Sequence, residues 1–151
     1  MKSWLRKGML AAAIALPAVE FGYAREREHA ATCTLATLKG RYLFVINGTV
    51  FPPASGVTTQ SLFTRSGYRI FNGDGTGTSI ATTSINGKVQ DPDIHSDLSY
   101  TINADCTGIL KVLAVGATQE LFIAPDGEDM TVIATDKGHV EAFRSWRVGP
   151  E

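Results

Sequence analysis

The sequence has few charged residues and only two cysteines. Charged side chains make up 19% of the 151 residues, with 14 basic groups against 15 acidic ones. This balance disfavours nucleic acids and anionic lipids as partners, and it excludes the highly charged class of disordered chains. Six prolines and 15 glycines, without a repeating period, exclude a collagen-like chain. We therefore expect one compact domain that needs no cofactor to fold.

Long apolar runs are absent except near the start of the chain. Basic residues precede an almost wholly apolar stretch over 8–19, and the small residues Gly22 and Ala24 suit cleavage after Ala24 by a signal peptidase. The run is much shorter than the roughly 20 residues that a membrane-spanning helix needs, so we expect no membrane anchor after cleavage. The sequence thus predicts a secreted or periplasmic protein. Its predicted parts are a signal peptide over 1–24, a lead-in over 25–37 and a single domain over 38–149.

Both cysteines follow the predicted cleavage point. In an oxidising compartment an isolated pair is most simply a disulfide, so we expect Cys33 to bond Cys106. The bond would close a loop of 73 residues and stabilise the fold by roughly 4 kcal/mol in the chain-entropy model. The alternative is a redox or metal-binding pair, which needs C-x-x-C spacing or nearby histidines. The sequence has neither, so we expect no metal.

From Leu38 onward the chain is divided into short segments rich in β-branched and aromatic residues. Turns such as Asn86-Gly87 are short enough to require hairpins. We predict an all-β fold, in which an antiparallel up-and-down meander of about eight strands closes into a small barrel. A β-sandwich is the alternative. The predicted strands are 38–47, 60–71, 76–85, 96–103, 109–115, 118–124, 129–135 and 139–148.

The chain has no recognisable catalytic motif. It lacks the Gly-x-Ser-x-Gly string of a serine hydrolase, and its glycines are not followed by the Lys-Ser or Lys-Thr of a phosphate loop. The segment over 71–77 resembles the start of a calcium loop, but too few oxygen ligands follow and a hairpin turn explains it. We expect no catalytic residues and no cofactor.

The last predicted strand carries a candidate binding group. If Arg144 and Trp146 face the barrel interior, Arg144 is a buried cation that needs a partner, and Glu120 is the nearest candidate by parity. Such a pair would bind a carboxylate or polarise a carbonyl. In the alternative, Arg144 extends to the rim with its stem packed on Trp146. The other candidate ligand contacts are Tyr42, Phe44, Leu98 and Tyr100.

Four strings of the mature chain occur together: Cys33 followed by Leu38-Lys39-Gly40-Arg41-Tyr42; Phe71-Asn72-Gly73-Asp74-Gly75-Thr76-Gly77; Ser84-Ile85-Asn86-Gly87; and Tyr100-Thr101-Ile102-Asn103-Ala104-Asp105-Cys106-Thr107-Gly108. In these strings the chain resembles a widespread group of exported bacterial proteins of unknown function. The resemblance implies a small secreted β-barrel with one disulfide, similar in outline to lipocalin-like and allene-oxide-cyclase-like barrels. It brings no catalytic residues. The segment over 63–69 is more basic than the apolar strand typical of the group, which leaves the pairing of that strand open.

Three functions follow from this sequence. The first is a binding module whose lumen or mouth holds a small, largely apolar molecule. The second is an enzyme of the cyclase or isomerase kind, in which Arg144 and Glu120 assist. The third is a structural or surface-interaction protein with a filled interior. We favour the first over an enzyme, and the sequence leaves the ligand and the oligomeric state open.

Overall fold

The computed structural model describes residues 32–52, 54, 57–90 and 92–149. The predicted signal peptide over 1–24 lies outside the described residues, as does 25–31 of the lead-in. The elements are a short 3-10 helix, η1 (Leu35–Leu38), and the strands β1 (Gly40–Val50), β2 (Ser61–Phe71), β3 (Thr76–Ile85), β4 (Lys88–Val89), β5 (Ile94–Ile102), β6 (Thr107–Val112), β7 (Ala117–Ile123), β8 (Asp129–Ala134) and β9 (His139–Arg147).

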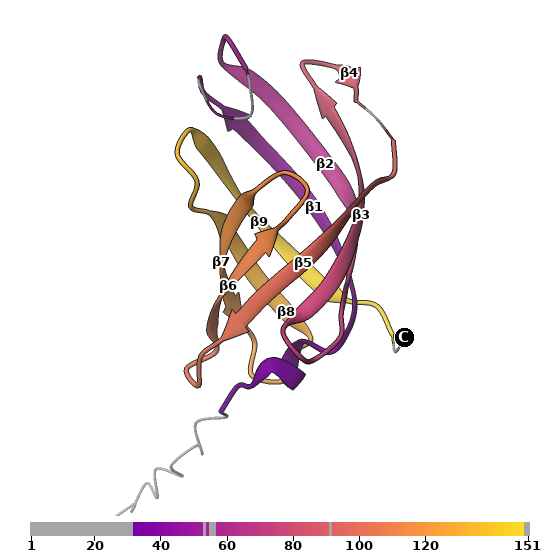
Figure 1. The fold of residues 1–151 in the computed structure, drawn as a ribbon, viewed down its shortest axis with the longest axis vertical. Helices are drawn as coiled ribbons and strands as arrows, with labels where there is room; N and C mark the ends of the chain where they lie inside the picture. Colours follow the sequence, from indigo (N-terminus) through magenta and orange to yellow (C-terminus); the bar gives the residue numbers. More distant parts are fainter. Residues whose placement is uncertain (1–31, 53, 55–56, 91, 150–151) are drawn as a thin grey trace, which may run out of the picture.

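The strands form a closed barrel (Figure 1). They pair in the order β2-β1-β9-β8-β7-β6-β5-β3-β4, and a further pairing between β2 and β3 closes the ring. Every pairing is antiparallel. The two-residue strand β4 pairs only with the end of β3. The predicted meander and its closure into a barrel are therefore confirmed, and the sandwich alternative is wrong.

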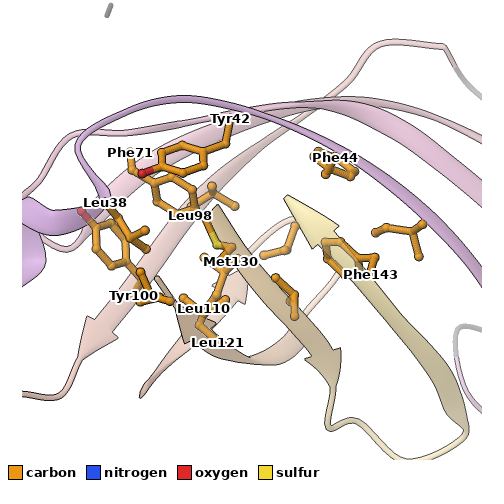
Figure 2. Packing of buried hydrophobic residues seen from close by; sticks show 14 of the residues in the cluster. Leu38, Tyr42, Phe44, Phe71, Leu98, Tyr100, Leu110, Leu121, Met130 and Phe143 are labelled. Atoms are coloured by element: carbon orange, nitrogen blue, oxygen red, sulfur yellow. The ribbon is translucent and has the colours of Figure 1, made fainter. Parts of the chain in front are cut away.

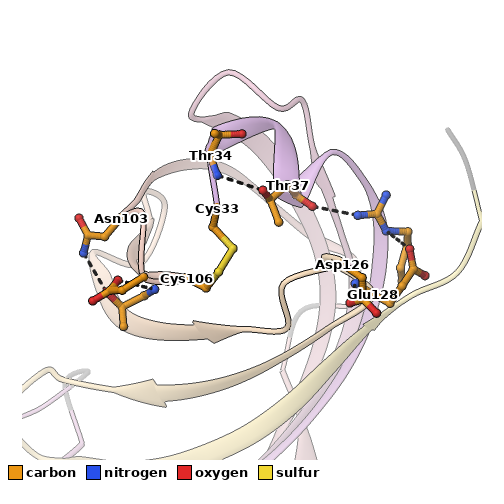
Figure 3. Close-up of a disulfide and its surroundings, with 10 residues drawn as sticks. Cys33, Thr34, Thr37, Asn103, Cys106, Asp126 and Glu128 are labelled. Carbon is orange, nitrogen blue, oxygen red and sulfur yellow. Dashed lines mark hydrogen bonds and ion pairs between the residues drawn. A yellow bond between two sulfur atoms is a disulfide. The ribbon is translucent and has the colours of Figure 1, made fainter. Parts of the chain in front are cut away.

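One end of the barrel is closed by η1 and the disulfide (Figure 3). Cys33 and Cys106 are bonded as predicted, and Cys33 also donates its backbone N–H to Ala104 O at 3.2 Å. Gly127 of the β7–β8 turn packs closely against this plug. Its φ is +70°, and a Cβ placed on it would stand 2.1 Å from the carbonyl oxygen of Thr37. Glycine is therefore required where the turn meets η1.

Aromatic rings fill the closed half of the barrel (Figure 2). Phe71 makes edge-to-face contacts with Tyr42 and Tyr100, with ring centroids 5.3 and 5.1 Å apart. The Tyr42 hydroxyl donates to Gly127 O, and the Tyr100 hydroxyl accepts the N–H of Gly73 at 3.0 Å. The packing thus leaves both tyrosine hydroxyls bonded to turn backbone at the closed end. Other buried members of this core are Leu38, Leu98, Leu110, Leu121, Met130 and Val132.

Two hairpin turns at the closed end share the pattern Asn-x-Asp-x-Thr, at 72–76 and 103–107. In both, the aspartate carboxylate accepts the threonine hydroxyl at 2.7 Å and also the threonine backbone N–H. The asparagine amide donates to the same hydroxyl at 2.9 Å in each turn. The segment that resembles a calcium loop is therefore one copy of a repeated turn, and Asp74 serves the hairpin.

Strand β2 pairs regularly with β1 along its whole length and with β3 over 63–71, which answers the question raised by its basic composition. The residues that face the interior are the odd-numbered ones, with Phe63 and Arg69 buried and Arg65 half-buried. Leu62, at 64% exposed, points outward. The even-numbered residues, which include Leu62, thus form the outer face of this strand, and the arginines lie inside.

Candidate functional site

A cavity of about 530 Å³ occupies the half of the barrel opposite η1. The hairpins β1–β2 and β3–β4 extend beyond the β6–β7 turn at this end of the barrel (Figure 1). The cavity lies between these extensions and the loops over 115–117 and 136–139. Its apolar walls include Val50, Val57, Phe63, Ile85 and Ala117, and its polar lining includes Ser61, Arg65, Thr83, His139 and Glu141.

Arg65 stands on the cavity wall and is held by the neighbouring strand. Its Nε donates to Thr83 Oγ1 at 2.7 Å, across the β2–β3 pairing. Burial lowers the pKa of Arg65, and the negative charge of Glu141 offsets part of that effect. Arg65 is therefore a fixed cation beside the apolar walls of the cavity.

Glu141 of β9 faces the same cavity and is only 8% exposed. Burial raises the pKa of Glu141, while His139, Arg65, Gln119 and Arg69 act in the opposite direction. Because burial is the larger effect, the protonated form of this carboxyl is favoured relative to the same group in water. The cavity thus contains a carboxyl whose charge is disfavoured beside cations whose charge is retained.

Arg69 lies deeper in the barrel and is 2% exposed. The Cζ of its guanidinium lies 4.6 Å from the ring centroid of Phe44 and 5.3 Å from that of Phe143. Its Nη2 donates to Gln119 Oε1 at 2.8 Å. Its Nε and Nη1 have no hydrogen-bond partner among the described residues. Burial lowers the pKa of Arg69 to about 9, which leaves the side chain charged at neutral pH.

A second, smaller chamber of about 20 Å³ adjoins Arg69. Its polar lining consists of Arg65, Arg69 and two serines, Ser79 and Ser96, and Phe44 and Ala81 supply apolar surface. Arg65 also lines the larger cavity, as does Val115, so these two residues stand between the chamber and the cavity. The interior therefore offers an apolar space that ends at a small, cationic one.

The predicted inward pair of Arg144 and Glu120 is wrong. The Arg144 side chain is 71% exposed and forms an ion pair with Asp129 on the outer surface. Trp146 is 37% exposed on the same face of β9. Glu120 lies outside the barrel, between Ile109 and Ile133 on the adjacent strands. The alternating pattern did not identify the inner face of β9, because its outer face is as apolar as its inner face, which carries Glu141.

The other predicted contacts face the interior, but most of them lie away from the cavity. Tyr42, Leu98 and Tyr100 are packed in the closed half and do not line the cavity of about 530 Å³. Phe44 reaches the smaller chamber and the guanidinium of Arg69. Whether any of these residues contacts a ligand stays a prediction.

Sequence reasoning missed Arg65, Arg69 and Glu141 as site residues. A usable indication was present, because both arginines share their parity with Phe63 and Phe71. Two phenylalanines on one face of a strand favour burial of that face, even when arginines alternate with them. Glu141 likewise shares its parity with Phe143.

The chain matches no protein-family model, and neither the curated proteins nor the solved structures contain a match to it. Within the described part of the chain, no helix has the length and apolar character needed to span a membrane. The same residues contain no group of three or more His, Cys, Asp or Glu side chains placed to hold a metal ion.

Proposed function

We propose that this protein is a secreted or periplasmic β-barrel that binds a small, largely apolar molecule in the cavity at its open end. The cavity carries the proposal, because a volume of about 530 Å³ falls in the range of roughly 300–1,000 Å³ typical of small-molecule sites. Its lining, apolar walls with a few polar side chains, also fits such a site. The Cys33–Cys106 disulfide supports an oxidising compartment. A purely structural barrel would need no such space.

A neutral fluorescent probe tests this proposal directly. N-phenyl-1-naphthylamine should bind the purified mature protein and gain fluorescence, because the walls around Phe63 and Ile85 would shield it from water. Native mass spectrometry of protein purified from its own host should also detect a copurified small molecule. Failure of the probe to bind, together with a ligand-free mass, would end the proposal.

A cavity-filling variant locates the binding. Ala117→Phe places a ring in the cavity and should weaken probe binding about tenfold or more, because the ring occupies the ligand's space. Ala142→Phe is the matched control, since Ala142 is exposed on β9 outside the barrel. Equal binding by both variants would place the probe elsewhere.

One observation favours the cyclase or isomerase alternative. Glu141 is a buried carboxyl on the cavity wall with a raised pKa, which is the property of a general acid. Under this alternative a bound molecule would be recovered chemically altered. Glu141→Gln would then stop the conversion while the molecule still binds. Recovery of the host-derived molecule unchanged after incubation with fresh protein would favour the binding module.

A further inference from the structure

The barrel interior carries more positive than negative charge. Arg65 and Arg69 come from β2, and the nearest opposing group is Glu141 on β9. Asp136 and Lys137 also line the cavity, at the loop between β8 and β9, where Asp136 accepts the N–H of Thr118. An excess cation in an interior is costly unless an anion joins it.

Arg69 is the cation with unused donors. The two aromatic rings cover its guanidinium, and Gln119 accepts from one nitrogen. The other two guanidinium nitrogens are buried and have no hydrogen-bond partner in the described part of the chain. Buried arginine donors are normally satisfied, because an unsatisfied one loses its hydration without compensation. The unsatisfied donors therefore point to a missing acceptor.

The space beside Arg69 limits the size of that acceptor. The chamber measures about 20 Å³, which exceeds the roughly 10–15 Å³ that one water molecule needs. It is lined by two guanidinium groups and two serines. The guanidinium groups and the Ser79 hydroxyl are donors suited to an anion, whereas the Ser96 hydroxyl donates to Asp97 O at 3.3 Å. This volume admits about one oxygen atom, so a carboxylate enters the chamber through one of its oxygens, and a tetrahedral sulfate or phosphate is bulkier.

We propose that the ligand is a monocarboxylate amphiphile, whose carboxylate binds Arg69 in the small chamber while its apolar part lies in the larger cavity. The inference rests on the proposed function and specifies its ligand class. Arg65 and Val115 line both spaces, so a single molecule reaches Arg69 by passing these two residues. Arg65 then lies beside the carboxylate as a second cation.

Probes that share one chain length distinguish the contribution of the head group to binding from that of the apolar chain. Decanoate, decanol and decyl sulfate compete for N-phenyl-1-naphthylamine, with acetate as the free small anion. Decanoate should bind about 10- to 100-fold more tightly than decanol, because it adds charge-assisted hydrogen bonds to Arg69. Decyl sulfate should bind more weakly than decanoate, and acetate alone should not displace the probe. Displacement by acetate as effective as that by decanoate would overturn the amphiphile in favour of a free anion.

The variant Arg69→Met tests whether Arg69 causes this preference for the carboxylate. Arg144→Met, on the outer surface, is the matched control. Arg69→Met should abolish the preference for decanoate while decanol binding remains, and Arg144→Met should change neither. Equal binding of decanoate and decanol by the parent protein, or a preference that survives Arg69→Met, would overturn this inference but leave the proposed function standing. Failure of all apolar probes to bind the parent protein would overturn both.

A measurement on the parent protein covers the case in which Arg69→Met does not fold. Decanoate labelled with carbon-13 at its carboxyl group is followed by NMR during an acid titration. In the bound state the carboxyl should stay ionised to lower pH than in free decanoate, because the guanidinium favours its charged form. A bound carboxyl that titrates like the free acid would show that no arginine contacts it.

Discussion

Arg69 and Glu141 lie in the same barrel interior but respond to burial in different ways. A guanidinium retains its charge under strong desolvation, and burial lowers the pKa of Arg69 only to about 9. A carboxyl responds by favouring its neutral form, and burial raises the pKa of Glu141. Because burial disfavours the charged form of Glu141, this carboxyl offsets the charge of the arginines only in part. The interior is thereby left with a cation that a ligand can neutralise.

The raised pKa of Glu141 predicts a pH-dependent loss of stability. The protonated carboxyl contributes stability that is fully present below its ordinary pKa of 4.5 and is lost as the pH rises through its folded-state value. Glu141→Gln has no such titration and keeps the neutral form at every pH. The free energy of unfolding of this variant, relative to the parent protein, should therefore increase from acid to neutral pH. Urea unfolding at several pH values measures the difference.

The groups that face Glu141 define what would contradict this prediction. His139 from the same strand, Arg65 and Arg69 from β2, and Gln119 from β7 all favour its charged form. If these groups outweighed burial, Glu141→Gln would become less stable than the parent protein as the pH rises. A difference that shrinks or reverses between acid and neutral pH would therefore refute the prediction.

The hairpin turns of the closed end illustrate how a short element is stabilised by its own side chains. In the turn at 103–107, Asp105 accepts two bonds from Thr107 and lies next to Cys106, which has a φ of +66°. A non-glycine residue rarely adopts this conformation without local support. The aspartate bonds and the disulfide supply that support together, at the point where η1 is attached to the barrel.

Asp105→Ala should destabilise the protein at neutral pH, because it removes the carboxylate oxygen that accepts both bonds from Thr107. Bonds from Thr107 hold the pKa of Asp105 below its usual value of 3.8. Their contribution is therefore present above that value and lost as the pH falls through the lower, folded-state one. The parent protein and the variant should converge in stability in strong acid. Asp97→Ala, at an exposed position of β5, is the control, and an equal loss in both variants would argue against the turn.

The strands were largely predictable from sequence, but the face of β2 and of β9 that points into the barrel was not predicted. Alternation and turn residues predicted eight strands near their observed positions, since these patterns are local. In β2 and β9 the charged residues obscured the inner face, although the parity of Phe63 and Phe143 favours the observed one. Arg65 and Glu141 line the cavity, and Arg69 lines the smaller chamber beside it. Leu62 and Trp146 face outward. The site was missed for the same reason, because a polar interior reverses the rule that charge marks the surface.

The barrel consists of two halves that are filled differently. The closed half holds the aromatic core, η1 and the disulfide. The open half holds the cavity and its charged lining. This division places the disulfide and the aromatic core away from the candidate site, where Arg69 carries unsatisfied donors.

The separation of the two halves predicts that stability and binding respond differently to loss of the disulfide. Replacing both Cys33 and Cys106 by serine should lower the free energy of unfolding by roughly 4 kcal/mol, because the unfolded chain regains the freedom of a long closed loop. The cavity lies at the opposite end, so probe affinity of the folded variant should stay within about twofold of the parent value. Urea unfolding and N-phenyl-1-naphthylamine titration below the unfolding transition measure the two quantities. A large loss of affinity in the still-folded variant would mean that the plug at the closed end also shapes the cavity, and that the two halves act as one unit.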